Sequence, residues 1–239
     1  MKQLERPQSL TAMAVDALRR AIVSGDLGLG EQLSEGTLSR MLGISKTPVR
    51  EALQQLRHEG LVRIIPQTGS FVFSMSAHEV LELCELRLTL EEAALHFAIE
   101  RNRAPFLKAL KRIVTEMERS QERGDTRGYL SLDTEYHAQF FDFCGNSYIA
   151  EAYSHIVGKV AALRTHLAAR PSHTKKSMAE HRAIVQAIES GEDDTLRATL
   201  HRHIGRTKKS YAENIDDIAQ ADRVFDANRP RSKQLVAIR

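Results

Sequence analysis

The first quarter of the chain alternates short helical patterns with glycine breaks. Apolar residues spaced three or four apart predict a first helix from Leu10 to Ser24, which Gly25 ends. Ser34 can cap a short second helix, Glu35 to Leu42, and Gly43 breaks it. The pattern therefore predicts two helices, followed by a glycine turn that leads into a third.

That third helix is predicted from its N-cap Ser45 to about His58, with Pro48 tolerated in the first turn. One side is apolar and can pack against the other helices: Val49, Ala52, Leu53 and Leu56. The opposite side is polar and cationic: Lys46, Thr47, Arg50, Gln54 and Arg57. A tight glycine turn between two such helices is typical of a helix-turn-helix.

Two short strands follow this helix pair. Segments 61–65 and 70–73 are rich in apolar and β-branched residues, and the turn-forming residues 66–69 separate them. The layout is that of a winged helix-turn-helix, which makes double-stranded DNA the leading partner. An arginine near the start of such a helix can reach guanine edges, and the candidates are Arg50 and Lys46. The alternative is that both are solvated charges on an ordinary surface helix.

The rest of the chain shows helical periodicity. After a capping box at 76–79, the predicted helices are 77–101, 104–123, 126–143, 147–169, 175–190 and 192–214. Residues 223–239 have little periodicity and are predicted to form a flexible basic tail, with an extra DNA-contacting arm as the alternative. The predicted fold is mainly α: a winged helix-turn-helix with a small β-hairpin wing (1–75), an antiparallel all-helical bundle (76–222) and the tail.

Composition narrows the class of protein. The 239 residues suffice for two domains, and the formal net charge of +3 is too small to establish nucleic-acid binding by itself. The two cysteines, Cys84 and Cys144, are too few and too far apart for a disulfide framework or a thiolate zinc site. No apolar run approaches membrane-spanning length and the start lacks a signal-peptide core, so a cytoplasmic protein without a membrane partner is expected.

The third helix also carries a family resemblance. The segment from Gly43 to Leu53, GISKTPVREAL, resembles the signature of the GntR family of bacterial transcription regulators. The resemblance implies DNA contacts from the start of this helix and the wing tip: Ser45, Lys46, Thr47, Arg50 and Gly69. Many members carry an arginine where this chain has Gly36, so its DNA affinity or operator sequence is expected to differ from the family norm.

Polar side chains interrupt the apolar faces of the second half. Asp133 and His137 lie four residues apart and so share one helix face. His181 and His203 lie among apolar neighbours, whereas His201 projects from the opposite side of its helix and is excluded. An Asp–His hydrogen bond or satisfied core histidines are the alternatives, but four inward-facing polar residues favour a metal site.

The same residues resemble the effector-binding FCD domain of the FadR subfamily: Asp133-x-x-x-His137, then Glu180-His181-x-x-Ile184, then His203. The resemblance implies a helical bundle that holds a divalent metal through Asp133, His137, His181 and His203. Such ligands suit zinc, nickel, cobalt or manganese without choosing among them. The free coordination positions would accept water or a carboxylate, which favours small organic acids as effectors.

Two arginines are candidates for binding an effector carboxylate. Arg87 lies on an apolar, inward-facing stripe, and its alternative is an i,i+4 pair with Glu91 at a helix surface. For Arg164 a role unrelated to the effector is the favoured alternative.

Three functions are compatible with these features. The first is a homodimeric regulator, most simply a repressor, that senses a small carboxylate at a metal-centred pocket; the homodimer is implied by the resemblance. In the second, the metal itself is the signal. The third, a metal-dependent hydrolase, is disfavoured because Glu135 and Glu180 are expected to point away from the ligands, which leaves no general base. The protein is therefore expected not to be an enzyme.

Overall fold

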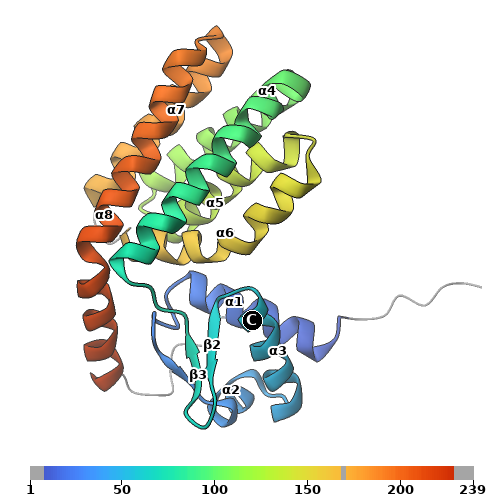
Figure 1. The fold of residues 1–239 in the computed structure, drawn as a ribbon, viewed down its shortest axis with the longest axis vertical. Coiled ribbons are helices and arrows are strands. Elements are labelled where there is room, and N and C mark those ends of the chain that lie inside the picture. Colours follow the sequence, from blue (N-terminus) through green and yellow to red (C-terminus); the bar gives the residue numbers. More distant parts are fainter. Residues whose placement is uncertain (1–7, 168–170, 229–239) are drawn as a thin grey trace, which may run out of the picture. The chain divides into compact units, whose positions relative to one another are not determined.

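The computed structural model describes residues 8–167 and 171–228 (Figure 1). The chain divides into two compact units: Met1–Ser74 together with Asp217–Arg239, and Met75–Asp216. The structure is mainly helical, as predicted, with one small sheet in the first unit. None of the helices in the described ranges is both long and apolar enough to cross a membrane.

Three helices form the core of the first unit. Helix α1 (Leu10–Val23) begins at Ser9, whose side chain accepts a hydrogen bond from the Ala12 amide. Helix α2 (Glu35–Leu42) is capped by Ser34 and ends at Gly43, which adopts the left-handed conformation with φ 66°. Helix α3 (Lys46–His58) buries the four predicted apolar residues. These helices confirm the predicted pattern.

Ser45 departs from expectation in one respect. It stands at the N-cap of α3 with extended backbone angles, but its side chain makes no capping hydrogen bond. Ser45 therefore begins the helix through its backbone conformation alone, and its exposed hydroxyl does not bond the amides of the first turn.

The sheet of the first unit has three strands. Strands β2 (Val62–Ile65) and β3 (Gly69–Val72) form the predicted hairpin, and β3 also pairs with β1 (Gln32–Leu33). Both pairings are antiparallel. β1 was not predicted, because two residues are too short to show the alternation that identifies a strand. The hairpin also differs slightly at its ends, since β3 begins at Gly69 rather than after it.

The second unit is a helical bundle whose first helix is bent. Helix α4 (Ala77–Glu122) starts at a complete capping box formed by Ser76 and Glu79. Asn102 is non-helical (φ −139°, ψ 31°) and Pro105 follows it, so α4 is two helical segments joined at a kink. A proline ring clashes with the carbonyl four residues earlier, which explains the break. The predicted interruption between 101 and 104 is confirmed.

The remaining helices are α5 (Thr126–Phe143), α6 (Ser147–Leu167), α7 (Pro171–Ser190) and α8 (Asp193–Asn228). Helix α8 extends well beyond the predicted end at Asn214. Residues 223–228 are therefore helical and not part of a flexible tail, while 229–239 lie outside the described residues. The missed pattern is the three- to four-residue spacing of apolar residues in this stretch: Ile215, Ile218, Ala221 and Phe225.

Candidate functional site

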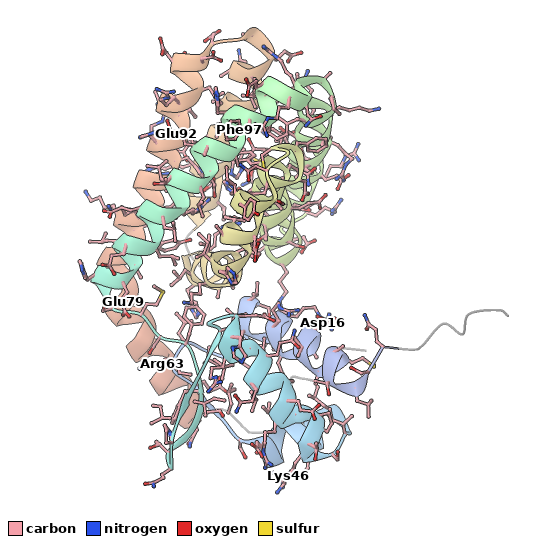
Figure 2. The ribbon with its side chains drawn as sticks, turned by 45° about the vertical axis from the view of Figure 1, so that its right-hand side comes forward. Asp16, Lys46, Arg63, Glu79, Glu92 and Phe97 are labelled. Carbon is pink, nitrogen blue, oxygen red and sulfur yellow. The ribbon has the colours of Figure 1, made fainter. Side chains whose placement is uncertain are left out.

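The predicted DNA-contacting residues of α3 lie together at an exposed helix start. Ser45, Lys46, Thr47 and Arg50 are all exposed, whereas Val49 is completely buried. Lys46, labelled in Figure 2, lies at the edge of the first unit. Amides at a helix start and nearby cations both favour phosphate, so this surface has the chemistry of a nucleic-acid interface.

Arg50 is held in place by a carboxylate from the preceding helix. Its Nε and Nη2 donate to the two carboxylate oxygens of Glu35 at 2.9 and 2.8 Å. The hydrogen bond from Arg50 is the main cause that lowers the pKa of Glu35. The Arg50 side chain is nevertheless 64% exposed, so its guanidinium remains accessible.

The two predicted glycine positions differ in their steric environment. Gly69 has φ 135°, and a Cβ there would lie 3.3 Å from Nε2 of Gln32, so a larger residue is disfavoured at this end of the wing. At Gly36 a Cβ would meet only ordinary contacts, the nearest being Cε of Lys46 at 3.8 Å. A side chain at position 36 is therefore compatible with the fold.

Three histidines from three helices meet inside the second unit. His137 (α5), His181 (α7) and His203 (α8) are buried, and each offers a ring nitrogen within 4.8 Å of those of the other two. Burial lowers the pKa of His181 to about 3, although the charge of Asp133 opposes this shift. Burial also lowers the pKa of His137. Neutral imidazoles with free lone pairs are the form that binds metal ions.

Buried or half-buried glutamates orient two of these rings. Nδ1 of His137 lies 2.8 Å from Oε2 of Glu91, and Nδ1 of His203 lies 2.8 Å from Oε2 of Glu180. Because an ionised carboxylate only accepts, each Nδ1 carries the proton and each Nε2 keeps its lone pair. This is how outer carboxylates commonly orient metal-binding histidines.

Glu180 corrects an expectation from the sequence. It was expected to point away from the metal ligands, but it contacts His203 and accepts two hydrogen bonds from Arg206, at 3.0 and 2.6 Å. Burial opposes ionisation of Glu180, but the hydrogen bonds from His203 and Arg206 lower its pKa to about 2. The contact depends on how α7 and α8 pack, which local spacing does not reveal. Glu135 is partly exposed and pairs with Arg112 instead.

Asp133 is near the histidines but is already paired. One of its carboxylate oxygens accepts a hydrogen bond from Arg164, and the other lies 3.5 Å from Nε2 of His181. Burial would raise the pKa of Asp133, but the charges of Arg164 and His181 outweigh burial and lower it. The geometric cluster thus contains three of the four predicted ligands, with Asp133 beside it.

Arg87 reaches the same cluster from α4. Its side chain is 1% exposed; Nε donates to Oε1 of Glu91 at 2.6 Å, and Nη2 lies 3.1 Å from Nε2 of His137. The i,i+4 pair with Glu91 therefore exists, but it is buried and not on the surface as that alternative assumed. Arg164 is also buried, and it reaches the cluster through Asp133, which lies beside His181.

We use the term polar cluster for these buried or partly buried side chains: Arg87, Glu91, Asp133, His137, Arg164, Glu180, His181 and His203. Sequence analysis considered Glu91 only as a surface partner of Arg87, and it did not predict that Glu91 and Glu180 would orient the histidines. The signal for Glu91 was its position four residues after Arg87, and the signal for Glu180 was its place beside His181 in the segment that resembles the FCD domain. The polar cluster can bind an anion through its guanidinium groups and a cation through its imidazoles.

Comparisons with known proteins agree with both units. Residues 10–72 match the family described as bacterial regulatory proteins, gntR family, and residues 82–206 match the FCD domain. The gluconate operon transcriptional repressor of Bacillus subtilis is 25% identical over 87% of this chain and 82% of its own. A probable D-xylose utilization operon transcriptional repressor of Paenarthrobacter nicotinovorans is 25% identical over 92% of this chain and 97% of its own.

A similar fold has been solved. The crystal structure of a putative transcriptional regulator from Rhodococcus sp. RHA1 superimposes with a TM-score of 0.75 at 20% identity, covering 85% of this chain and 98% of that one. At this identity the likeness concerns the fold alone.

Proposed function

Because this chain belongs to the GntR family of bacterial regulatory proteins and carries an FCD domain, we propose that it is a repressor whose polar cluster senses a small organic acid. The family makes it a DNA-binding transcriptional regulator and not an enzyme. The single observation that carries the sensing role is the buried Arg164. Its Nη2 has no hydrogen-bond partner among the described residues.

The DNA contacts are proposed at the start of α3 and at the wing. Lys46 and Thr47 would contact phosphates, and Arg50 would reach base edges in the major groove. The exposed hydroxyl of Ser45 makes no capping hydrogen bond, so it is available for a DNA contact at the helix start. Gly69 would let the wing approach the minor groove. Arg197, which is 71% exposed and pairs with Glu92 on α4, is not part of this surface.

The effector is proposed to be a carboxylate. A buried guanidinium with an unsatisfied N–H is costly, and a carboxylate is the group that best satisfies it. Arg164 has this unsatisfied N–H, and Arg87 contributes a second buried guanidinium to the polar cluster. One relative is named as the repressor of a gluconate operon, and gluconate is itself a small carboxylate.

A divalent metal, one of zinc, nickel, cobalt and manganese, is proposed as a cofactor of this cluster. The residues fit such an ion, since His181 has two buried ring nitrogens without a hydrogen-bond partner among the described residues and two rings are oriented by glutamates. A bound ion would supply a positive centre for the carboxylate. Nη2 of Arg87 now contacts Nε2 of His137, so this contact must open before His137 can bind the ion.

The second candidate function makes the metal itself the signal. The three converging imidazoles favour it, because they form the densest group of metal-binding atoms in the described part of the chain. Titration of metal-free protein separates the two functions. If metal alone changes operator affinity and no organic acid does, the ion is the signal.

A homodimer is proposed to place two winged units on two half-sites of an operator. The first segment of α4 supports it, since Leu86, Leu90, Ala93 and Phe97 recur at helical spacing and remain at least partly exposed. Figure 2 shows Phe97 on this helix. Leu86→Glu would place a charge on the stripe, so we expect sedimentation to show a larger monomer fraction at equal protein concentration.

The proposed response is a change in population between DNA-binding states. An effector that binds one dimer geometry more tightly than another shifts the equilibrium by that difference in affinity. We test the proposal by titrating operator DNA with and without carboxylates, using metal-free and metal-loaded protein. Release of DNA by a carboxylate supports the proposed repressor, whereas DNA binding that no carboxylate alters contradicts it.

A further inference from the structure

The five tyrosines of the chain fall into three groups by the state of their hydroxyls. The hydroxyls of Tyr129 and Tyr136 donate to the carbonyl oxygens of Thr174 and His181, at 3.2 and 3.3 Å. Tyr148 is 83% exposed. The third group consists of Tyr153 on α6 and Tyr211 on α8, whose hydroxyls are buried and unpaired among the described residues.

Tyr153 and Tyr211 are buried, 3% and 1% exposed, and neither hydroxyl has a hydrogen-bond partner among the described residues. Buried polar groups are almost always hydrogen-bonded, and leaving one unpaired costs free energy. The same helical bundle thus buries two unpaired phenols and an arginine with an unpaired N–H, and one bound polar ligand would supply the partner that all three lack.

The packing of α8 against α4 brings Tyr211 toward Arg87. Lys208 pairs with Glu85 at 2.6 Å, while Arg197 and His201 both pair with Glu92, so the two helices run antiparallel. Tyr211 lies one turn beyond Lys208, and Arg87 lies two residues after Glu85. Side chains tilt toward the N-terminus of their own helix, so on antiparallel helices these two side chains converge.

Tyr153 faces the polar cluster from α6. It precedes Arg164 by eleven residues, close to three full turns, so both lie on one face of the helix. The Tyr153 ring stacks on Phe141, with ring centroids 3.8 Å apart, which fixes the direction of the hydroxyl. Burial first, and then the charge of Glu91, raises the pKa of Tyr153.

The charges of Arg87 and Arg164 act on the Tyr211 phenol as they do on that of Tyr153. Burial raises the pKa of Tyr211, and the charges of Arg164 and Arg87 oppose the rise. Both phenols therefore stay protonated at neutral pH. Each offers one O–H donor and two acceptor lone pairs, which is the pattern that complements an alcohol hydroxyl.

Resting on the proposed carboxylate sensing, we infer that Tyr153 and Tyr211 select a hydroxylated carboxylic acid, with their phenols bonding its alcohol groups while Arg164 bonds its carboxylate. The ligand class is thus a hydroxy acid. A plain carboxylic acid of equal length would satisfy the arginine and leave both phenols unpaired. Sites built to bond a hydroxyl discriminate strongly against analogues that lack it.

The test uses matched pairs of acids that differ in hydroxyl groups: propionate with lactate, succinate with malate, and hexanoate with gluconate. Binding to the full-length protein is followed by tyrosine ultraviolet difference spectra, which the absence of tryptophan makes clean. We expect the hydroxylated member of at least one pair to bind about tenfold more tightly, as one good hydrogen bond allows. Tyr153→Phe or Tyr211→Phe should reduce that ratio to near one.

The affinity for the plain acid should stay unchanged in both variants, and Tyr148→Phe should behave as the wild type because its hydroxyl is exposed. Equal binding of both members of every pair overturns the inference and leaves carboxylate sensing intact. A ratio that persists in the double Tyr153→Phe, Tyr211→Phe variant also overturns it. If no acid binds to the wild type, carboxylate sensing and the inference fail together.

A second measurement needs no ligand. Removing an unsatisfied buried hydroxyl should keep or raise the thermal midpoint, so Tyr153→Phe and Tyr211→Phe should be at least as stable as the wild type. Tyr136→Phe, which removes a satisfied hydroxyl, should lower the midpoint. A loss of stability in the first two variants equal to that in Tyr136→Phe would show that their phenols already have partners, and would overturn the inference.

Discussion

Each unit contains an arginine–glutamate pair, and the two pairs are built in opposite ways. Arg50 and Glu35 are 64% and 31% exposed, whereas Arg87 and Glu91 are 1% and 0% exposed. An exposed pair is screened by water and contributes little to stability, so losing Glu35 would cost Arg50 little in the proposed contact with DNA. A buried pair stays together because separating it would leave an unpaired charge in the protein interior, which costs free energy. The proposed DNA surface therefore carries accessible charge, and the polar cluster carries buried charge.

The largest expected effect comes from breaking the buried pair. Glu91→Ala leaves Arg87 without its carboxylate and removes the acceptor for Nδ1 of His137. We expect a loss of about 3–5 kcal/mol in the free energy of unfolding, measured by urea denaturation. The neighbouring Glu92→Ala removes only surface pairs with Arg197 and His201 and should cost less than about 1 kcal/mol. Equal losses in the two variants would contradict the comparison.

The next effect concerns metal affinity. His203→Ala removes an imidazole from the three-histidine group. Loss of a residue that only hydrogen-bonds a metal ligand typically weakens metal binding roughly 10–100-fold, so loss of the ligand itself should weaken zinc or nickel binding by more than that. Calorimetry on metal-free protein measures the affinity and the stoichiometry. His201→Ala is the control, because His201 is exposed and pairs with Glu92. Wild-type stoichiometry and affinity in His203→Ala would remove His203 from the ligands.

A smaller effect is expected at the exposed pair. Arg50→Ala should weaken operator binding by about 1–3 kcal/mol, roughly 5–150-fold, because the proposed base contact of this arginine is lost. The unfolding midpoint should hardly change, since the pair with Glu35 lies at the surface. Fluorescence anisotropy with labelled DNA measures the affinity, and Arg197→Ala should bind as the wild type does. Unchanged affinity of Arg50→Ala would exclude α3 as the reader.

The smallest effect is expected at Gly36, where the fold leaves room for a side chain. Gly36→Arg adds a cation beside Lys46, so the slope of log affinity against log salt should steepen by about one unit if it meets a phosphate. Gly36→Ala, which adds no charge, serves as the control. An unchanged slope in Gly36→Arg would mean that position 36 does not face the DNA backbone.

The sequence predicted elements whose signals are local. Ser34 and Gly43 mark the ends of α2, and Pro105 accounts for the break within α4. The convergence of His137, His181 and His203 was also predicted, from their inward-facing positions and a family resemblance. Such features need only the spacing of residues along one helix, or a motif.

Features that depend on how helices pack were missed. The contact of Glu180 with His203 requires the register of α7 against α8, and the pairing of Arg164 with Asp133 requires that of α6 against α5. Strand β1 exists only because β3 provides a partner for two residues. The unpaired hydroxyls of Tyr153 and Tyr211 are visible only once every neighbouring helix is in place.

The most direct test of the account is operator binding with and without the panel of acids, using DNA upstream of the protein's own gene, moderate salt and excess competitor DNA. The account predicts sequence-selective binding that at least one hydroxy acid weakens by about tenfold or more, and that Arg164→Lys makes insensitive to the acid. Selective DNA binding that none of the acids alters, at any metal loading, would contradict the claim that the polar cluster controls the DNA-binding surface.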